Sequence, residues 1–256
     1  MGYVLELKNI GMNFHDAQGE TIAVDDVSFG VSRGEFVSIV GPSGCGKSTL
    51  LSIISGMVKP SRGECTIGGT PVSAGGKTHS TVGYMLQSDH LFEWRTIMGN
   101  VRLGLEVRKD LTPASLTACE NLLSRYGLAE FRDHRPSQLS GGMRQRAALI
   151  RTLAIDPAIL LLDEPFSALD FQTRLHVTDD ISTIIRKEGR TAVLVTHDIS
   201  EAVSVSDRVI VLSKRPSRIL NIHSVGLSDA ETPPIKAREH PSFRKHFNTI
   251  WKELEG

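Results

Sequence analysis

Residues 41–49 read GPSGCGKST, and this glycine-rich stretch decides how the rest of the sequence is interpreted. It fits the pattern GxxxxGK[ST], in which backbone N–H groups approach phosphate oxygens so closely that a Cβ atom would obstruct them. The ammonium of Lys47 would reach the β- and γ-phosphates, and the hydroxyl of Ser48 would bind Mg²⁺. A helix from about Thr49 would turn its positive end toward the same phosphates. The residues predicted to hold a nucleoside triphosphate are Gly41, Pro42, Ser43, Gly44, Cys45, Gly46, Lys47, Ser48 and Thr49.

Short apolar runs around this loop predict an α/β fold. Residues 36–40, 159–162 and 192–195 are each followed by a glycine or polar turn and then by helix-compatible sequence, as buried parallel strands are. Residues 4–7 and 23–31 alternate β-branched and polar side chains, which predicts an antiparallel β region near the N-terminus. The sequence therefore predicts a P-loop NTPase core with a mostly parallel sheet and an N-terminal antiparallel β region.

Helical sequence occupies the middle and the end of the chain. Between about residues 89 and 156 the apolar residues recur at helical spacing, and Pro113 fits a helix start. We expect an inserted α-helical subdomain there. A last helix is predicted over residues 242–254, and it either docks on its own domain or binds a partner.

Two adjacent acids follow one of the predicted strands. Asp163 and Glu164 come directly after residues 159–162, at the end of a predicted strand, as the P-loop of residues 41–49 follows the predicted strand 36–40. Asp163 would orient the metal, directly or through water, and Glu164 would polarise the water that attacks the γ-phosphate. The alternative is that both acids merely begin a loop. The pair favours hydrolysis over simple nucleotide binding.

Two further polar residues lie at strand ends. His197 follows residues 192–195, where a neutral imidazole could bond the γ-phosphate or the water, or could be structural. Gln87, in YMLQSDH, could reach Mg²⁺ or the water, or could be a loop residue. The catalytic candidates are thus Glu164, His197 and Gln87, and the metal candidates are Ser48, Gln87 and Asp163.

Composition excludes several other classes of protein. The chain of 256 residues has a formal net charge of zero, so it offers no electrostatic footprint for nucleic acid or an anionic membrane. The longest apolar run found in its middle part, residues 158–162, is far shorter than the roughly 18 to 20 residues of a membrane span. The N-terminus lacks a signal core, and we expect a cytosolic protein.

The cysteines fit a reducing compartment. Cys45, Cys65 and Cys119 are an odd number without CxxC spacing, which argues against a disulfide framework or a zinc site. Because Cys45 stands near a predicted helix N-terminus, we expect a thiolate there that ATP would protect from alkylation.

The stretch LSGGMRQR, residues 139–146, joins these separate features. Together with GPSGCGKST, Gln87, ILLLDEP at 159–165, SALD at 167–170 and His197, it makes residues 3–215 resemble the ATP-binding subunits of ATP-binding cassette (ABC) transporters. The resemblance implies ATP and Mg²⁺ as ligands. It also implies an ABC nucleotide-binding domain over residues 1–222, with its helical subdomain at about 89–156, and a short C-terminal extension over 223–256.

The same resemblance implies a head-to-tail dimer of two such subunits, and a homodimer is favoured. Each ATP would lie between the P-loop of one subunit and Ser140, Gly141 and Gly142 of the other. A glycine-rich helix start is a suitable second anion site, and a single chain cannot bring both anion sites to one γ-phosphate if they lie on different subdomains. Asp170 would link the two sites across the interface. Phe14 matches the aromatic residue that stacks on adenine, its alternative being an ordinary core side chain.

Further partners follow from weaker likenesses. The segment SDHLFEWRTIMGN after Gln87 resembles the loop that docks on an integral membrane permease subunit, with Leu91, Phe92 and Trp94 as exposed contacts or, alternatively, as core. The segments FEWRTI, KRPSRI (214–219) and FNTIWKEL resemble importer ATPases for nitrate, taurine, alkanesulfonate and bicarbonate. The protein would then lie peripherally on the cytoplasmic face of the cell membrane, reach a solute-binding protein only indirectly, and bind no nucleic acid.

Two other classes of nucleotide-binding protein fit the sequence less well. A soluble ABC-type ATPase acting on DNA or ribosomes usually carries a coiled-coil insertion or a second cassette, and neither is found in this sequence. A P-loop GTPase would need an NKxD segment, which is also not found. The solute and the identity of the second cassette stay open.

Overall fold

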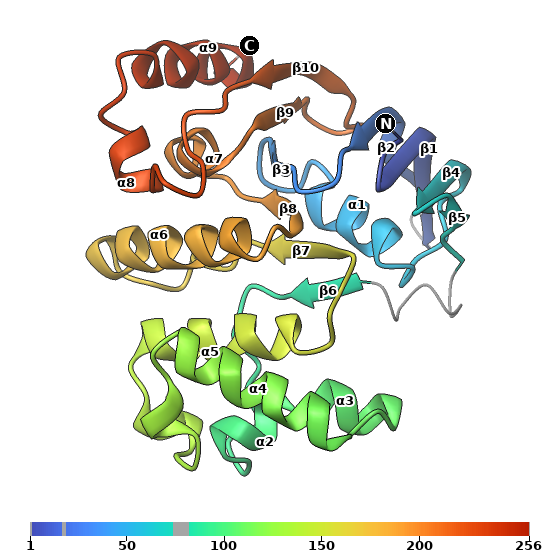
Figure 1. Ribbon diagram of the computed structural model, residues 1–256. Coiled ribbons are helices and arrows are strands. Elements are labelled where there is room, and N and C mark those ends of the chain that lie inside the picture. The colour runs from blue at the N-terminus through green and yellow to red at the C-terminus, as the bar shows by residue number, and fades with distance from the viewer. Residues whose placement is uncertain (1, 17–18, 74–81, 256) are drawn as a thin grey trace.

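The three predicted buried strands form the middle of a six-stranded sheet in the computed structural model, which describes residues 2–16, 19–73 and 82–255. The strand order is β10-β9-β3-β8-β7-β6, and all strands run parallel except β10, which is antiparallel to β9 (Figure 1). The strands are β3 (Phe36–Val40), β6 (Val82–Met85), β7 (Ile159–Asp163), β8 (Thr191–Val195), β9 (Arg208–Leu212) and β10 (Ile219–Ser224).

Both faces of this sheet are covered, which explains why its central strands are apolar at nearly every position. Successive side chains of a strand point to opposite faces. On β7, Ile159 and Leu161 belong to one buried cluster, whereas Leu160 and Leu162 belong to another. The first cluster includes α1 (Lys47–Ile54), and the second includes α5 (Gly141–Leu153) and α6 (Phe171–Lys187).

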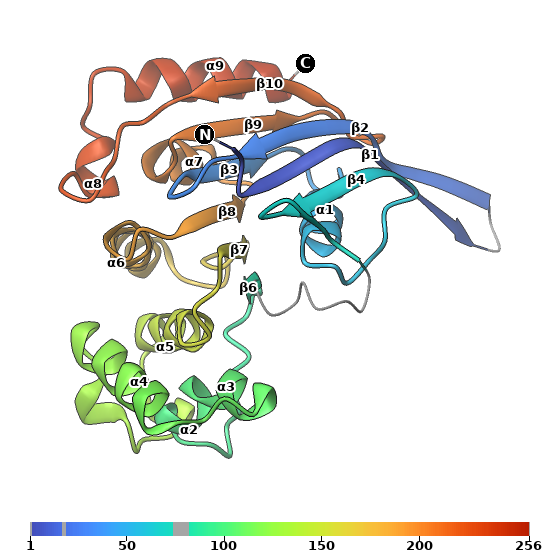
Figure 2. The same cartoon turned by 45° about the vertical axis from the view of Figure 1, so that its right-hand side comes forward.

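An antiparallel sheet lies beside the first cluster. Its strand order is β2-β1-β4-β5, and α1 lies between the two sheets (Figure 2). The strands are β1 (Leu5–Asp16), β2 (Gly19–Val31), β4 (Arg62–Ile67) and β5 (Thr70–Pro71). The predicted antiparallel N-terminal region is therefore present, and its strands are longer than the sequence pattern indicates.

The segment between β6 and β7 is helical. It contains α2 (Ile97–Val101), α3 (Leu103–Arg108), α4 (Pro113–Arg125) and α5. Pro113 occupies the first turn of α4, and the hydroxyl of Thr112 accepts a hydrogen bond from the Ser115 N–H. The predicted helix start at Pro113 is thus confirmed. In Figure 1 these helices form a separate layer below β6 and β7.

The other end of the sheet is covered by α7 (Ile199–Val205), which precedes β9, and by the chain that follows β9. Strand β10 pairs with β9, and α7, α8 (Pro234–Ala237) and α9 (Phe243–Glu255) lie on that side. Helix α9 confirms the predicted last helix, and its Ile250 is buried against α7 and β9, so it docks on its own chain.

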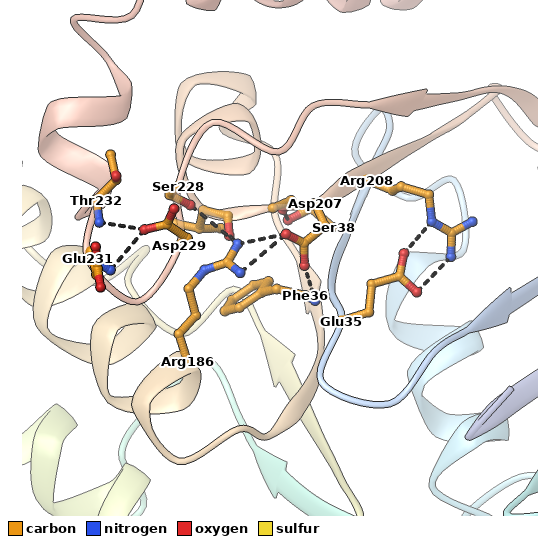
Figure 3. Close-up of polar contacts among 12 residues, drawn as sticks. Glu35, Phe36, Ser38, Arg186, Asp207, Arg208, Ser228, Asp229, Glu231 and Thr232 are labelled. Atoms are coloured by element: carbon orange, nitrogen blue, oxygen red, sulfur yellow. Dashed lines mark hydrogen bonds and ion pairs between the residues drawn. The ribbon is translucent and has the colours of Figure 1, made fainter. Parts of the chain in front are cut away.

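The side chain of Arg186, on α6, binds the segment that follows β10. Its guanidinium donates hydrogen bonds to the Val205 carbonyl at 2.7 Å and to Ser228 Oγ at 3.3 Å, and it pairs with Asp207 at 3.2 Å (Figure 3). It also lies 5.7 Å from the centre of the Phe36 ring, a cation–π distance. One side chain therefore joins α6, the central sheet and the C-terminal segment.

The predicted fold class is confirmed: an α/β core with a mostly parallel sheet, an antiparallel N-terminal region and inserted helices. Within the described ranges, no helix combines the length and apolar character that crossing a membrane requires.

Candidate functional site

Sheet order brings most of the predicted site residues to one edge. Strands β3, β8, β7 and β6 are consecutive neighbours and run parallel, so their carboxyl ends meet at the same edge (Figure 1). The P-loop follows β3, His197 follows β8, and Gln87 follows β6; Asp163 is the last residue of β7, and Glu164 follows it. Ligands of open α/β sheets bind beyond the carboxyl ends of the strands.

The P-loop has the geometry that phosphate binding needs. Gly46 caps α1 with φ +116°, and a Cβ atom there would lie 3.1 Å from the Ala23 carbonyl oxygen. Lys47 is 6% exposed, and its ammonium donates to the carbonyls of Gly41 at 2.8 Å and Pro42 at 3.0 Å. The described residues give this buried cation no ion-pair partner, so it fits an anionic ligand such as a triphosphate.

The metal candidates Ser48 and Asp163 meet beside the P-loop. Ser48 Oγ donates to Asp163 Oδ1 at 3.1 Å, and the Tyr84 hydroxyl donates to Asp163 Oδ2 at 3.2 Å. Burial raises the pKa of the Asp163 carboxyl, while these two hydrogen bonds oppose the rise. One carboxylate and one hydroxyl are a donor set that Mg²⁺ accepts when phosphate oxygens and water complete its shell.

Tyr84 is a site residue that the sequence interpretation missed. It lies on β6, beside β7, so its hydroxyl reaches the acid that ends the neighbouring strand. The sequence feature that could have indicated Tyr84 is its position three residues before Gln87. The strand that carries it was not predicted from the sequence.

Glu164 and His197 form a pair next to this group. Glu164 Oε2 lies 3.0 Å from His197 Nδ1, and the Glu164 N–H donates to the Val195 carbonyl of β8 at 2.9 Å. Glu164 has φ +44°, a left-handed conformation that is uncommon for a residue other than glycine. Such conformations concentrate at functional sites, where the surrounding structure holds them.

Gln87 reaches the same loop by way of Ser167. Its amide Nε2 donates to Ser167 Oγ at 3.1 Å, and Ser167 Oγ donates to the Glu164 carbonyl at 2.9 Å. Gln87 is therefore tied to the backbone of Glu164 and does not contact Asp163 through a hydrogen bond.

The expectation of a reactive thiolate at Cys45 is wrong. The side chain is 1% exposed, and burial raises the pKa of its thiol in spite of the nearby Lys47. The sulfur points inward, since a Cβ atom added at Gly41 would lie 2.9 Å from Cys45 Sγ. The helix terminus thus does not expose this thiol to an alkylating reagent.

The residues Ser140, Gly141 and Gly142 of the LSGGMRQR stretch, called the signature from here on, lie at the start of α5 and not beside the P-loop. The Ser140 hydroxyl accepts a hydrogen bond from the Met143 N–H at 3.4 Å and so caps the helix. Helices α5 and α1 pack on opposite faces of the six-stranded sheet. Among the described residues no hydrogen bond joins the P-loop to Ser140, Gly141 or Gly142. One chain therefore does not bring the two candidate anion sites together.

Asp170 and Phe14 keep their predicted roles as candidates. Asp170 caps α6, and the hydrogen bond from Thr173 holds the pKa of its carboxyl below the usual value. Phe14 lies on β1 with 44% of its surface exposed, so the alternative of an ordinary core phenylalanine is wrong.

Arg215 contacts the P-loop and was not singled out from the sequence. Its guanidinium donates to the Gly44 carbonyl at 2.8 Å. The neighbouring Ser217 donates from its N–H to the Ala23 carbonyl at 3.1 Å. The segment 214–219, quoted only as a likeness to importer ATPases, thus packs against the phosphate loop.

The segment after Gln87 is only partly exposed. Trp94 is 71% exposed and stacks on Phe92 with ring centroids 4.7 Å apart, whereas Leu91 is 6% exposed. The expectation that Leu91 is an exposed contact is wrong, because its side chain packs in the cluster beneath α5. Arg144 of α5 pairs with Asp89 at 2.8 Å and with Glu93 at 2.8 Å, which ties this segment to the signature helix.

Comparisons with known proteins agree with this arrangement. Residues 24–167 match the family described as ABC transporter. An uncharacterized ABC transporter ATP-binding protein of Bacillus subtilis, YtlC, is 46% identical over 250 residues, covering 98% of this chain and 95% of the relative. The taurine import ATP-binding protein TauB of Yersinia pestis is 39% identical over 238 residues, covering 92% of each chain.

Solved structures of ATP-binding cassettes have a similar fold. The ATP-binding cassette MJ0796, in a dimeric post-hydrolysis state bound to ADP and Pi, superposes with a TM-score of 0.73 at 31% identity, covering 86% of this chain and 98% of that one. The cbiO1 protein of Clostridium perfringens, part of the ABC transporter complex cbiONQ, superposes with a TM-score of 0.77 at 25% identity, covering 97% and 99%.

Proposed function

This chain belongs to the ABC transporter family as an ATP-binding subunit, and from that premise we propose that it hydrolyses ATP with Mg²⁺ to power import of a small solute. The observation that carries the proposal of hydrolysis is the Glu164–His197 pair beside Ser48 and Asp163. A chain that only bound nucleotide would need no carboxylate at this place.

In the proposed reaction the P-loop binds the triphosphate, and the Lys47 ammonium turns from the loop carbonyls to the β- and γ-phosphates. Mg²⁺, when bound by Ser48, Asp163 and Gln87, would neutralise charge on the phosphate oxygens. Glu164 accepts the proton of the attacking water, and His197 bonds the γ-phosphate or that water and orients Glu164. The exposed imidazole of His197, with 54% of its surface accessible, has room to do so.

The working unit in this proposal is a head-to-tail dimer, with an identical chain favoured as the second subunit. Ser140, Gly141 and Gly142 of one subunit would complete the ATP site on the P-loop of the other, and Asp170 would link the sites. Phe14 would stack on adenine. The support is that α5 and α1 lie on opposite faces of one sheet, and that the related cassette MJ0796 is a dimer.

The membrane partners follow from the docking segment and from the relatives. Phe92 and Trp94 would contact an integral membrane permease subunit, and the protein would then lie peripherally on the cytoplasmic face of the membrane. The likeness to TauB favours taurine or an alkanesulfonate as the solute, within a group that includes nitrate and bicarbonate importers. A solute-binding protein would deliver the solute to the permease. Residues 1–222 would be the ABC nucleotide-binding domain, with its helical subdomain at 89–156, and 223–256 the C-terminal extension.

Purification from detergent-solubilised cells tests the transport role. We expect the tagged chain to bring down an integral membrane protein, and we expect the reconstituted complex to hydrolyse ATP faster with a loaded solute-binding protein. The replacement Trp94→Ala should lose the membrane partner, while the replacement of exposed Val107 by Ala, as a control, should keep it. Recovery of ribosomes or DNA instead would favour a soluble ABC-type ATPase and would refute the importer.

A further inference from the structure

Glu201 is a buried carboxyl group that the proposed reaction does not use. It lies on α7 with 4% of its surface exposed. A carboxylate in such a place is costly unless hydrogen bonds stabilise it. The Thr178 hydroxyl of α6 donates to Glu201 Oε1 at 3.4 Å, and the hydroxyl of Thr196 lies near enough to the carboxyl group to lower its pKa by hydrogen bonding.

The second of these hydroxyls belongs to the turn that carries His197. The Asp198 N–H donates to Thr196 Oγ1 at 3.0 Å, and the Glu201 N–H donates to Asp198 Oδ1 at 3.1 Å. Glu201 thus holds both ends of the turn 196–198, by its carboxyl group at Thr196 and by its backbone at Asp198. His197 projects from the middle of that turn to Glu164.

A narrow cavity separates Glu201 from the catalytic candidates. Its lining includes Glu164, His197, Ser167, Arg174 and Glu201. Arg174 donates from Nη2 to the Leu169 carbonyl at 2.9 Å, next to Asp170. The carboxyl group of Glu201 therefore lies directly behind the two loops that carry the candidate site residues.

The C-terminal segment contributes a charge to the same place. The positive charges of Arg238, which follows α8, and of Arg174 on α6 lower the pKa of the Glu201 carboxyl group. The negative charge of Asp198 raises it. The segment is held there because the Ile235 N–H donates to Asp179 Oδ1 of α6 at 3.0 Å, and because Arg186 binds Ser228 (Figure 3).

We propose that Glu201 is a positioning residue that holds the turn 196–198, and through it His197, for ATP hydrolysis, and that Arg238 supports its charge. This inference rests on the proposed function, since it assigns Glu201 a role only if His197 and Glu164 act on ATP. An ionised carboxylate accepts hydrogen bonds from both hydroxyls, whereas a protonated carboxyl group does so less well. Through Arg238, the C-terminal segment would then affect the rate of ATP hydrolysis without contacting the nucleotide.

The pH dependence of turnover provides the readout. Burial raises the pKa of Glu201 to about 7 and the charge of Asp198 adds to the rise, while the hydrogen bond from Thr196 and the charges of Arg174 and Arg238 oppose it. Because the ionised form is the one that holds the turn, kcat should fall as the pH drops through neutrality. Removing the cation of Arg238 should move the midpoint of this fall to higher pH.

The experiment measures kcat and KM for ATP across neutral pH in the full chain and its variants. For Glu201→Gln we expect about tenfold lower kcat, an effect typical of lost outer-shell contacts, and loss of the component that titrates near neutrality. KM for ATP should stay unchanged, because the P-loop is intact. For Arg238→Met we expect the midpoint to rise, and Glu239→Gln, an exposed neighbour, should behave as the unaltered protein.

Three outcomes overturn the inference. Unchanged kcat and pH profile in Glu201→Gln would remove its role, and a uniform loss at every pH would make the role merely structural. An unmoved midpoint in Arg238→Met, which remains measurable if Glu201→Gln does not fold, would refute the part of the C-terminal segment. If instead the unaltered chain does not hydrolyse ATP, or His197→Ala turns over normally, the proposed function itself fails.

Discussion

The candidate site has two halves, one around the P-loop and one at the signature residues 140–142. They differ in how many of their contacts are already made within one chain. Around the P-loop, Lys47, Ser48 and Asp163 are already bonded to their neighbours. At the signature, the Ser140 hydroxyl accepts one long hydrogen bond, and Gly141 is exposed. The side chains of the first half are hydrogen-bonded to one another and to the loop without a ligand, whereas the second half offers only the start of a helix on the opposite face of the sheet.

The two halves also differ in what they are tied to. The P-loop is held by Arg215 and by the antiparallel sheet behind Gly46. The signature helix is instead tied to the segment after Gln87, through Arg144 and its two carboxylates. The residues proposed to bind nucleotide at the P-loop and those proposed to contact partner subunits are therefore held by different parts of the chain, and variants in the two halves should fail in different ways.

Glu164→Gln should have the largest effect. We expect kcat to fall by about 10² to 10⁴-fold, the range for loss of a general base, while ATP binding stays intact and an ATP-bound dimer accumulates. Phosphate release and size-exclusion chromatography with ATP measure both properties. Glu130→Gln, at an exposed position, is the control. Normal turnover in the variant would remove Glu164 from the role of base.

Lys47→Ala should break the P-loop half alone. Loss of charge-assisted hydrogen bonds worth about 1.5 to 3 kcal/mol should weaken nucleotide binding by roughly 10 to 100-fold. The loss should already be present in the monomer, because the loop belongs to one chain. Titration with a fluorescent ATP analogue at low protein concentration checks this, with exposed Lys59→Ala as the control. Equal affinity would contradict the placement of the ammonium on phosphate.

Much of the P-loop half could be predicted from the sequence because its residues follow apolar strands with fixed spacing. The strands before Lys47, Asp163 and His197 occur where the pattern indicated, and the sheet order then brings their ends together. Tyr84 and Arg215 were missed because their roles depend on tertiary neighbours. β6 is too short for a clear pattern, and the contact of Arg215 with Gly44 joins residues 171 positions apart.

Burial was the property that sequence reasoning judged least well. Cys45 and Leu91 stand in segments that look exposed, yet both side chains point into clusters built by distant residues. Local helix-end arguments favour a thiolate at Cys45, but desolvation outweighs them. The fold class needs only periodicity, whereas the environment of one side chain needs the packed structure.

Ser140→Ala should break the signature half alone. The dimer should lose about tenfold or more in kcat, because a charge-assisted contact to the phosphate would come from the other chain. Monomer nucleotide affinity should be unchanged, since no hydrogen bond among the described residues joins Ser140 to the P-loop of its own chain. Ser137→Ala, also exposed, controls for loss of a hydroxyl nearby. Weaker monomer binding would show that the two halves belong to one site in one chain.

Gly141 and Gly142 are adjacent in the signature, but we expect them to be needed for different reasons. A Cβ atom at Gly142 would lie 2.9 Å from Val177 Cγ2 of α6, whereas one at Gly141 would lie 3.3 Å from Leu169 Cδ2. Gly142→Ala should therefore cost about 1 to 3 kcal/mol by overpacking. That loss lowers Tm by roughly 2 to 12 °C in a domain of this size.

Gly141→Ala should keep Tm nearly unchanged and lose only dimer ATPase activity, because its N–H is offered to the other chain. Thermal unfolding and turnover measured together separate the two, and equal Tm values would mean that Gly142, too, is required for the ligand and not for packing of α5 on α6.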